Sequence, residues 1–294
     1  MQNGEANVSA TAQTSKRVSL LNRLYGLNGR ILFGGALVLF IVILAIAAPL
    51  LATHDPLRVR MSDRLLPPSF DNWLGTDNNG RDVYSRIVYG ARISVLVGSA
   101  VVILSTFFGT LIGLIAGYYR RMDGPMMRFM DAVMTFPSIL LAIAIIAALG
   151  ASAQNVIIAL TVSFVPHTAR VVRGKVLSVR EETYVESARA IGLGDTRIIL
   201  RYILPNTLAP LMVQATFILA LAIIAEAGLS YIGAGTPPPT PSWGNILADG
   251  RAFLNNAWWM TTFPGIFIMI SVLGLNILGD GLRDLLDPRM ENNR

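Results

Sequence analysis

The sequence YVESARAIGLGDTRIILRYILP, residues 184–205, decides the fold because it is charged and interrupted, while the chain on either side is strongly apolar. It combines two glycines and a terminal proline with a set of charged residues: Glu186, Arg189, Asp195, Arg197 and Arg201. Neither a membrane-spanning helix nor a simple loop requires such a composition, so this stretch must serve another purpose.

The first half of this stretch predicts a short amphipathic helix. Ser178 and Glu181 have the spacing of a capping box, which predicts a helix that begins near Val179. Apolar residues then recur at helical spacing, and Gly192 stands where a helix ends in a left-handed cap.

The second half predicts another helix after a tight turn at Leu193 and Gly194. Asp195 is a favourable N-cap, and the helix that it opens, 196–204, is expected to end at Pro205. Three hypotheses follow for this stiff helix–turn–helix. It lies on the lipid surface, packs on the membrane helices of its own chain, or binds a cytoplasmic partner.

The rest of the chain is typical of an all-α integral membrane protein. It is 53% hydrophobic and 14% charged, and several apolar runs reach or approach the roughly 20 residues that a helix needs to cross a bilayer. A lipid-exposed segment must satisfy its own backbone polar groups, so these runs are expected to be helices. Six spans are predicted: Ile31–Leu51, 93–117, 132–149, 156–172, 211–229 and 263–278.

The distribution of Lys and Arg predicts the orientation in the membrane. If the N-terminus lies inside, 17 of the 24 Lys and Arg residues fall on the inner side, which predicts two cytoplasmic termini. The net charge of +6 then needs no nucleic-acid partner. The predicted organisation comprises an inner tail 1–30, disordered over 1–15, a membrane domain 31–288 and an inner tail 289–294. The membrane domain carries outer loops 53–91 and 230–262 and an inner loop 173–210.

Small and acidic residues inside the spans mark candidate contacts. Gly109, Gly113 and Gly117 form a small-residue stripe that lets another helix approach closely, either within this chain, which we favour, or in a second subunit. Glu226 is the main intramembrane charge. Two hypotheses remain open for it: a protonated or snorkelling side chain near the outer surface, or a polar contact to a neighbouring helix or to a path through the membrane.

The sequence lacks the usual signs of catalysis. It contains no phosphate-binding G-x-x-x-x-G-K-[ST] motif and no G-x-S-x-G nucleophile motif. His54 and His167 are its only histidines, and it has no cysteine, so no metal site is predicted. We therefore expect no catalytic residue, no metal and no cofactor in this chain.

Several motifs resemble one known family. Glu186-Ser187-Ala188, followed by Gly192 and Leu204-Pro205, is similar to the EAA loop of ABC-importer permeases. Ser187 and Tyr202 depart from that pattern, which usually has Ala and Ile. Three longer strings resemble the DppC/OppC-type permease subunits of dipeptide and oligopeptide ABC importers: LGTDNNGRDVYSRIVYGARIS (74–94), PPTPSWGNILADGR (238–251) and LGDGLRDLLDP (278–288).

The resemblance implies a type I ABC-importer permease in a bacterial inner membrane, with no catalysis of its own. It implies a heterodimer with a second, homologous permease subunit, two cytoplasmic ATPase subunits that bind ATP and magnesium, and an extracytoplasmic solute-binding protein. The residues implied to contact the ATPase are Glu186, Ser187, Ala188, Gly192, Leu193, Gly194 and Asp195. Membrane lipid surrounds the spans. Relatives are also associated with glutathione or nickel, and an ATP-independent channel or secondary transporter is the rival class.

Overall fold

A computed structural model describes residues 29–286 of the chain, so the predicted tails lie almost wholly outside the described residues. Within that range the regular structure is helical and contains no β-strand. Five helices are long and apolar enough to cross a membrane, or six if one bent pair counts as a single span. The expectation of an all-α membrane protein is confirmed.

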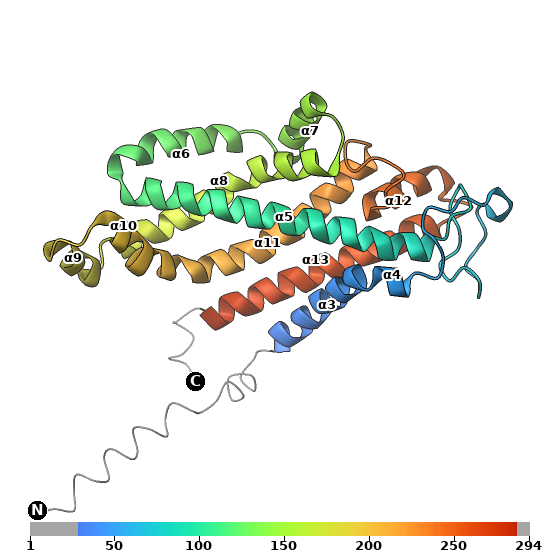
Figure 1. Cartoon of the computed structure of the whole chain (residues 1–294), viewed down its shortest axis with the longest axis horizontal. Helices are drawn as coiled ribbons and strands as arrows, with labels where there is room; N and C mark the ends of the chain where they lie inside the picture. Colours follow the sequence, from blue (N-terminus) through green and yellow to red (C-terminus); the bar gives the residue numbers. More distant parts are fainter. Residues whose placement is uncertain (1–28, 287–294) are drawn as a thin grey trace, which may run out of the picture.

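The helices run roughly along one long axis (Figure 1). The first span is α3, with the short α4 after a break at Ala47. The helical bounds are α3 Gly29–Ile46, α4 Ala48–Leu51, α5 Val83–Tyr118, α6 Arg120–Met134, α7 Ser138–Leu149, α8 Ala153–Val179, α9 Thr183–Ala190, α10 Asp195–Ile198, α11 Leu204–Tyr231, α12 Trp243–Gly250 and α13 Trp259–Leu286. Three short segments, η1 Met61–Asp63, η2 Ile199–Ile203 and η3 Arg251–Phe253, complete the set.

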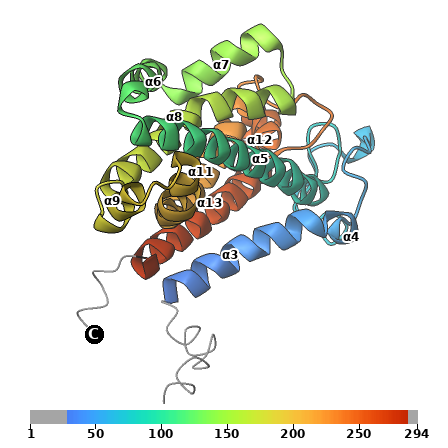
Figure 2. The same ribbon diagram turned by 60° about the vertical axis from the view of Figure 1, so that its left-hand side comes forward.

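The long helices form two pairs that α11 joins. α5 lies against α8, α3 lies against α13, and α11 contacts α5, α8 and α13 (Figures 1 and 2). A hydrophobic cluster joins α3, α5, α12 and α13 at one end of the bundle, a second joins α5, α7, α8 and α11, and a third holds α9 and α10 to the other end. The molecule therefore has two distinct ends, joined by α5.

The third expected span, 132–149, is not one straight helix. α6 and α7 meet at an angle of 87°, with Pro137 directly before α7. A proline has no N–H to donate and disfavours helical geometry in the residue before it, so the helix breaks there. The 12 residues of α7 extend only about 18 Å, which is short of a bilayer core of about 30 Å.

Helix α5 begins ten residues before the predicted span 93–117. Asp82 is its N-cap and accepts a hydrogen bond from the backbone N–H of Ser85 at 2.8 Å. The helix therefore takes up the last part of the segment that was expected to be an outer loop, 53–91. It continues without interruption for 36 residues, or about 54 Å, to Tyr118.

The predicted boundaries of the inner helix–turn–helix need correction at both ends. Ser178 lies inside α8, which runs to Val179, so the predicted capping box is not used and the next helix begins at Thr183. Pro205 does not end the second helix either. It occupies the first turn of α11, directly after a π-helical segment, and there its missing N–H breaks no regular α-helical bond.

Candidate functional site

Residues 180–198, from the end of α8 to the end of α10, form a connector at the end of the bundle that the distribution of Lys and Arg predicts to be the inner one (Figure 1). One face of its short helix α9 is anchored. Val185 and Ala188 are buried in a cluster with Val176, Ile198 and Ile203, which belong to α8, α10 and η2. The connector is thus packed on the membrane helices of its own chain, as one of the three hypotheses expected.

The opposite face of α9 is open. Glu186, Ser187 and Arg189 are exposed, and Ile191 at the tip is 77% exposed. The Ser187 hydroxyl donates to the Thr183 carbonyl at 2.8 Å, so it stays on its own helix. An exposed isoleucine in the same segment as exposed charged residues has the composition of a contact surface, whereas a solvated loop tip gains nothing from an apolar side chain.

The bend after α9 depends on Gly192. Its φ is +79°, in the left-handed region that glycine adopts without strain. Gly192 N–H donates to the Arg189 carbonyl at 2.9 Å, and Leu193 N–H donates to the Ala188 carbonyl at 3.1 Å. This pair of bonds is a Schellman motif, so the predicted left-handed cap at Gly192 is confirmed.

Asp195 has a different role from the predicted one. Gly194 is the N-cap of α10, and Asp195 is its first residue. The Asp195 carboxylate accepts a hydrogen bond from the hydroxyl of Tyr118 at 2.7 Å. It therefore ties the start of α10 to the last residue of α5.

Two further groups of the connector hold the same end of α5. Arg180 Nη1 donates to the carbonyl of Gly117 at 2.8 Å, and the Arg189 guanidinium lies 5.2 Å from the centre of the Tyr118 ring. Arg180 also donates to the Glu181 carboxylate at 2.9 Å, which lowers the pKa of that exposed carboxyl. The connector thus contacts the end of α5 through three residues: Arg180 before α9, Arg189 within α9 and Asp195 after it.

The glycine stripe of α5 lies against α8 of the same chain. A Cβ added at Gly113 would lie 2.7 Å from the carbonyl oxygen of Ala169 and from Cβ of Val172. Gly109 approaches Thr168 and Gly117 approaches Val176 in the same way, at 2.5 and 2.6 Å. These contacts leave no room for a side chain along the inner half of the interface between α5 and α8.

The other end of α5 carries a buried ion cluster, formed by Asp77, Arg81, Arg86 and Asp249. Asp77 is fully buried and accepts from Arg81 Nε at 2.7 Å and from Arg86 Nη1. Both arginines also contact Asp249 of α12, at 3.1 and 3.0 Å. The cluster therefore fastens the outer loop and α12 to the first turn of α5.

Glu226 is buried near this outer end. Its carboxyl group accepts hydrogen bonds from Ser94 of α5 at 3.0 Å and from Ser230 of α11 at 2.8 Å. The Ser230 hydroxyl in turn accepts from the backbone N–H of Thr236 at 3.2 Å. Of the two hypotheses for Glu226, the geometry favours the polar contact to a neighbouring helix.

Sequence analysis missed the ion cluster. The strings 74–94 and 238–251 were interpreted only as a family resemblance, although the first carries Asp77, Arg81 and Arg86 and the second carries Asp249. The i, i+4 spacing of Asp77 and Arg81 could have predicted their ion pair, whereas the pairing of Arg81 with Asp249 depends on tertiary structure. Among residues 29–286 no group of three His, Cys, Asp or Glu side chains is placed to hold a metal.

Comparison with known proteins identifies the family. Residues 109–292 match the family described as binding-protein-dependent transport system inner membrane component, and residues 28–68 match the N-terminal transmembrane domain of oligopeptide transport permease C. A peptide transport system permease protein of Brucella suis is 51% identical over 88% of this chain and 87% of its own length. The dipeptide transport system permease protein DppC of Alkalihalophilus pseudofirmus is 47% identical over 90% and 88%.

Solved structures support the same fold. The MetNI methionine ABC transporter, in an inward-facing conformation, matches 66% of this chain and 94% of its own with a TM-score of 0.51 and 22% identity. An amino acid ABC transporter matches 69% and 94% with a TM-score of 0.54 and 11% identity. The chain therefore belongs to the inner membrane components of binding-protein-dependent transport systems, as a multi-pass ABC-importer permease of the DppC/OppC type.

Proposed function

We propose that this chain forms half of the translocation path of an ATP-driven importer for dipeptides or short oligopeptides. Relatives that are 51% and 47% identical over nearly 90% of the chain are named as peptide and dipeptide permeases, which supports that solute class. The other half of the path belongs to a second, homologous permease subunit. This chain contributes no catalysis, and ATP and magnesium bind to separate ATPase subunits.

The observation that carries this proposal is the two-faced connector. Val185 and Ala188 anchor one face, while Glu186, Arg189 and Ile191 leave the other face open at the inner tip. A surface that is rigidly mounted and still unpaired suits a protein partner. The partner is an ATPase subunit, which contacts Glu186, Ser187 and the bend at 192–195, and whose movements reach α5 through Tyr118.

The proposed topology follows from this contact. The connector and both termini lie in the cytoplasm, and the two outer loops, the second of which contains α12, face an extracytoplasmic solute-binding protein. The ion cluster of Asp77, Arg81, Arg86 and Asp249 holds that outer face in a fixed conformation. The tail and loop boundaries predicted from the sequence belong to the same proposal.

The topology is tested with single cysteines, since the chain has none of its own. A cysteine at Ser187 should react with a membrane-impermeant thiol reagent only after the cells are opened, whereas one at Thr240 should react in intact cells. Labelling of Ser187→Cys from outside would invert the proposed orientation.

Coupling is tested by reversing one charge. In the complete complex reconstituted with its binding protein, Glu186→Lys should reduce peptide-stimulated ATP hydrolysis at least about tenfold. The proposed ATPase contact buries this carboxylate, and disrupting a charge that is buried in an interface costs several kcal/mol. Asp280→Lys is the control, since Asp280 is also exposed on the inner side but lies outside the connector. Full stimulation of the Glu186→Lys complex would refute the coupling role.

The solute is tested separately. Dipeptides should stimulate the wild-type complex, and glutathione or nickel should not. Stimulation by glutathione or nickel, without stimulation by dipeptides, would support the ATP-driven importer and contradict the proposed solute class. Solute flux by this chain without any ATPase subunit would instead favour the channel or secondary-transporter class.

A further inference from the structure

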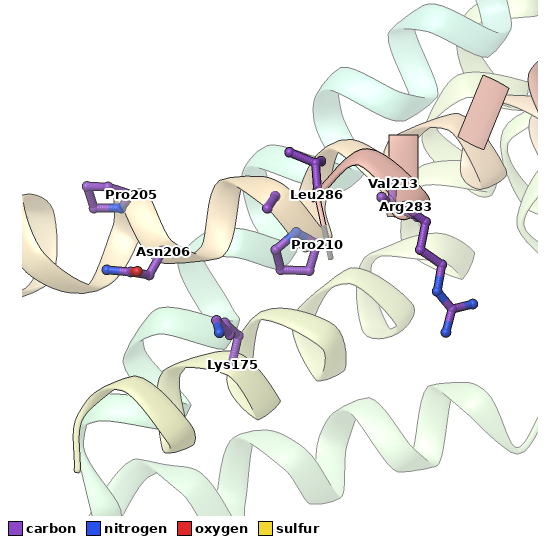
Figure 3. Close-up of a pocket in the computed structure, with 8 residues that line it drawn as sticks. Lys175, Pro205, Asn206, Pro210, Val213, Arg283 and Leu286 are labelled. Atoms are coloured by element: carbon purple, nitrogen blue, oxygen red, sulfur yellow. The ribbon is translucent and has the colours of Figure 1, made fainter. Parts of the chain in front are cut away.

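A cavity at the inner end of the bundle plays no part in the proposed coupling contact. It has a volume of about 460 Å³ and opens between α8, α11 and α13 (Figure 3). Lys175 extends from α8 toward α11, and Arg283 extends from α13 on the other side of the gap (Figure 3). The remaining lining is mainly apolar: Ala209, Pro210, Val213 and Leu286.

The charge of this cavity is unbalanced. Two cations line it and no carboxylate does. α8 contains no acidic residue, and the single acid of α11, Glu226, is near the opposite end of that helix. On α13, Asp284 is paired with Arg30 at 2.9 Å, and Asp280 lies within 4.0 Å of no cation among residues 29–286. Within that range neither Lys175 nor Arg283 has an ionic partner.

The depth of the cavity matches the inner membrane surface. Arg283 is next to Asp284, whose partner Arg30 is the second residue of the first span. Lys175 lies four residues before the end of α8, which is about 6 Å along the helix. A cationic rim over an apolar wall at this depth matches a lipid, because phosphate oxygens need the cations and the glycerol and upper acyl chain need the apolar wall.

We propose that this cavity binds the headgroup of an anionic phospholipid from the inner leaflet, with its phosphate between Lys175 and Arg283. The apolar residues of α11 and α13 cover the upper part of one acyl chain. The bound lipid then lies between α8 and α11, the two helices that lead into and out of the connector. It therefore stabilises the base of the connector, and coupling depends on the presence of anionic lipid.

The test measures lipid binding directly, on the complete complex. The wild-type complex and a Lys175→Gln/Arg283→Gln complex are titrated with phosphatidylglycerol in phosphatidylcholine nanodiscs, and bound lipid is counted by native mass spectrometry. Each cation near the membrane surface contributes about fivefold to the affinity for anionic lipid, so the double variant should need at least about fivefold more phosphatidylglycerol for half occupancy.

Two controls separate the site from general charge. Arg121→Gln/Arg128→Gln removes two exposed cations from α6 and should bind phosphatidylglycerol like the wild type. Lys175→Arg/Arg283→Lys keeps both charges and should also retain binding. Equal loss in the Arg121→Gln/Arg128→Gln complex, or full binding by the Lys175→Gln/Arg283→Gln complex, would overturn the proposal.

A third arm identifies the source of the phosphate. In nanodiscs of phosphatidylcholine alone, inorganic phosphate should not restore the ATPase stimulation that phosphatidylglycerol supports. Restoration by inorganic phosphate would assign the cavity to a soluble anion and overturn the lipid site. Because lipid counting needs no transport, its failure would leave the proposed importer function untouched.

Discussion

The two ends of α5 are held in different ways. At the outer end, Asp77, Arg81 and Arg86 are buried side chains in contact with one another and with Asp249. At the inner end, the contacts lie at the surface: the Tyr118 hydroxyl donates to the exposed carboxylate of Asp195, Arg180 donates to the Gly117 carbonyl, and the connector beyond them is solvated on one face. A buried charge network is costly to break, whereas an exposed hydrogen bond contributes little. The outer end is thus fixed in shape, and the inner end is the one that, under the proposed function, an ATPase subunit moves.

The two ends can differ in this way only if α5 is one rigid helix that is held against α8. Gly113→Leu should have the largest effect of all, because a side chain there would overlap the backbone of Ala169 and the side chain of Val172. We expect loss of the assembled complex, measured by size-exclusion recovery after expression. Gly35→Leu is the matched control, since a Cβ at Gly35 in α3 meets nothing within 4 Å. Normal recovery of Gly113→Leu would show that α5 does not need close packing against α8 at this position, and α5 would then not link the two ends rigidly.

The rigidity of the outer end is tested by Asp77→Asn. Two arginines would lose their buried anionic partner, and breaking a buried pair costs about 3–5 kcal/mol. We expect a clearly lower thermal midpoint of the purified complex, whereas the exposed Asp71→Asn should change it little. An unchanged midpoint for Asp77→Asn would show that the outer end is no better fixed than the inner one.

The inner end is tested with a matched pair of serines. Gly192→Ser places a side chain at φ +79°, which costs about 1–2 kcal/mol, whereas Gly194→Ser adds the same side chain at φ −68° in a favourable N-cap position. Gly192→Ser should reduce peptide-stimulated ATP hydrolysis several-fold with little change in complex recovery. Equal activity of the two variants would contradict a role for the bend in coupling.

The smallest expected effect belongs to Tyr118→Phe. It removes one partly exposed hydrogen bond to Asp195, worth about 1 kcal/mol, and keeps the ring under Arg189. We expect an unchanged thermal midpoint and about a two- to fivefold loss of coupling, read as peptide-stimulated relative to basal ATP hydrolysis. A drop in the midpoint comparable to that of Asp77→Asn would make the two ends of α5 equivalent.

Much of the fold could be predicted from the sequence, because the periodicity and length of an apolar run determine a membrane helix locally. The positions of α3, α5, α8, α11 and α13 follow from runs long enough to satisfy their own backbone within lipid. The bend at Gly192 was also readable, since only local backbone geometry sets it. The capping box at Ser178 failed because the continuing helix α8 already satisfied those N–H groups. Pro205 failed as a stop because a π-helical segment accommodated it.

The sequence by itself determined the helical membrane class, the family and the bend of the connector, because each rests on neighbouring residues or on strings of fixed order. Only the tertiary structure decided which charges meet. Asp249 reaches Arg81 and Arg86 across more than 160 positions of sequence, Asp195 reaches Tyr118, and Lys175 shares a cavity with Arg283. Pairings of this kind depend on how the helices pack in space, and no local periodicity encodes that.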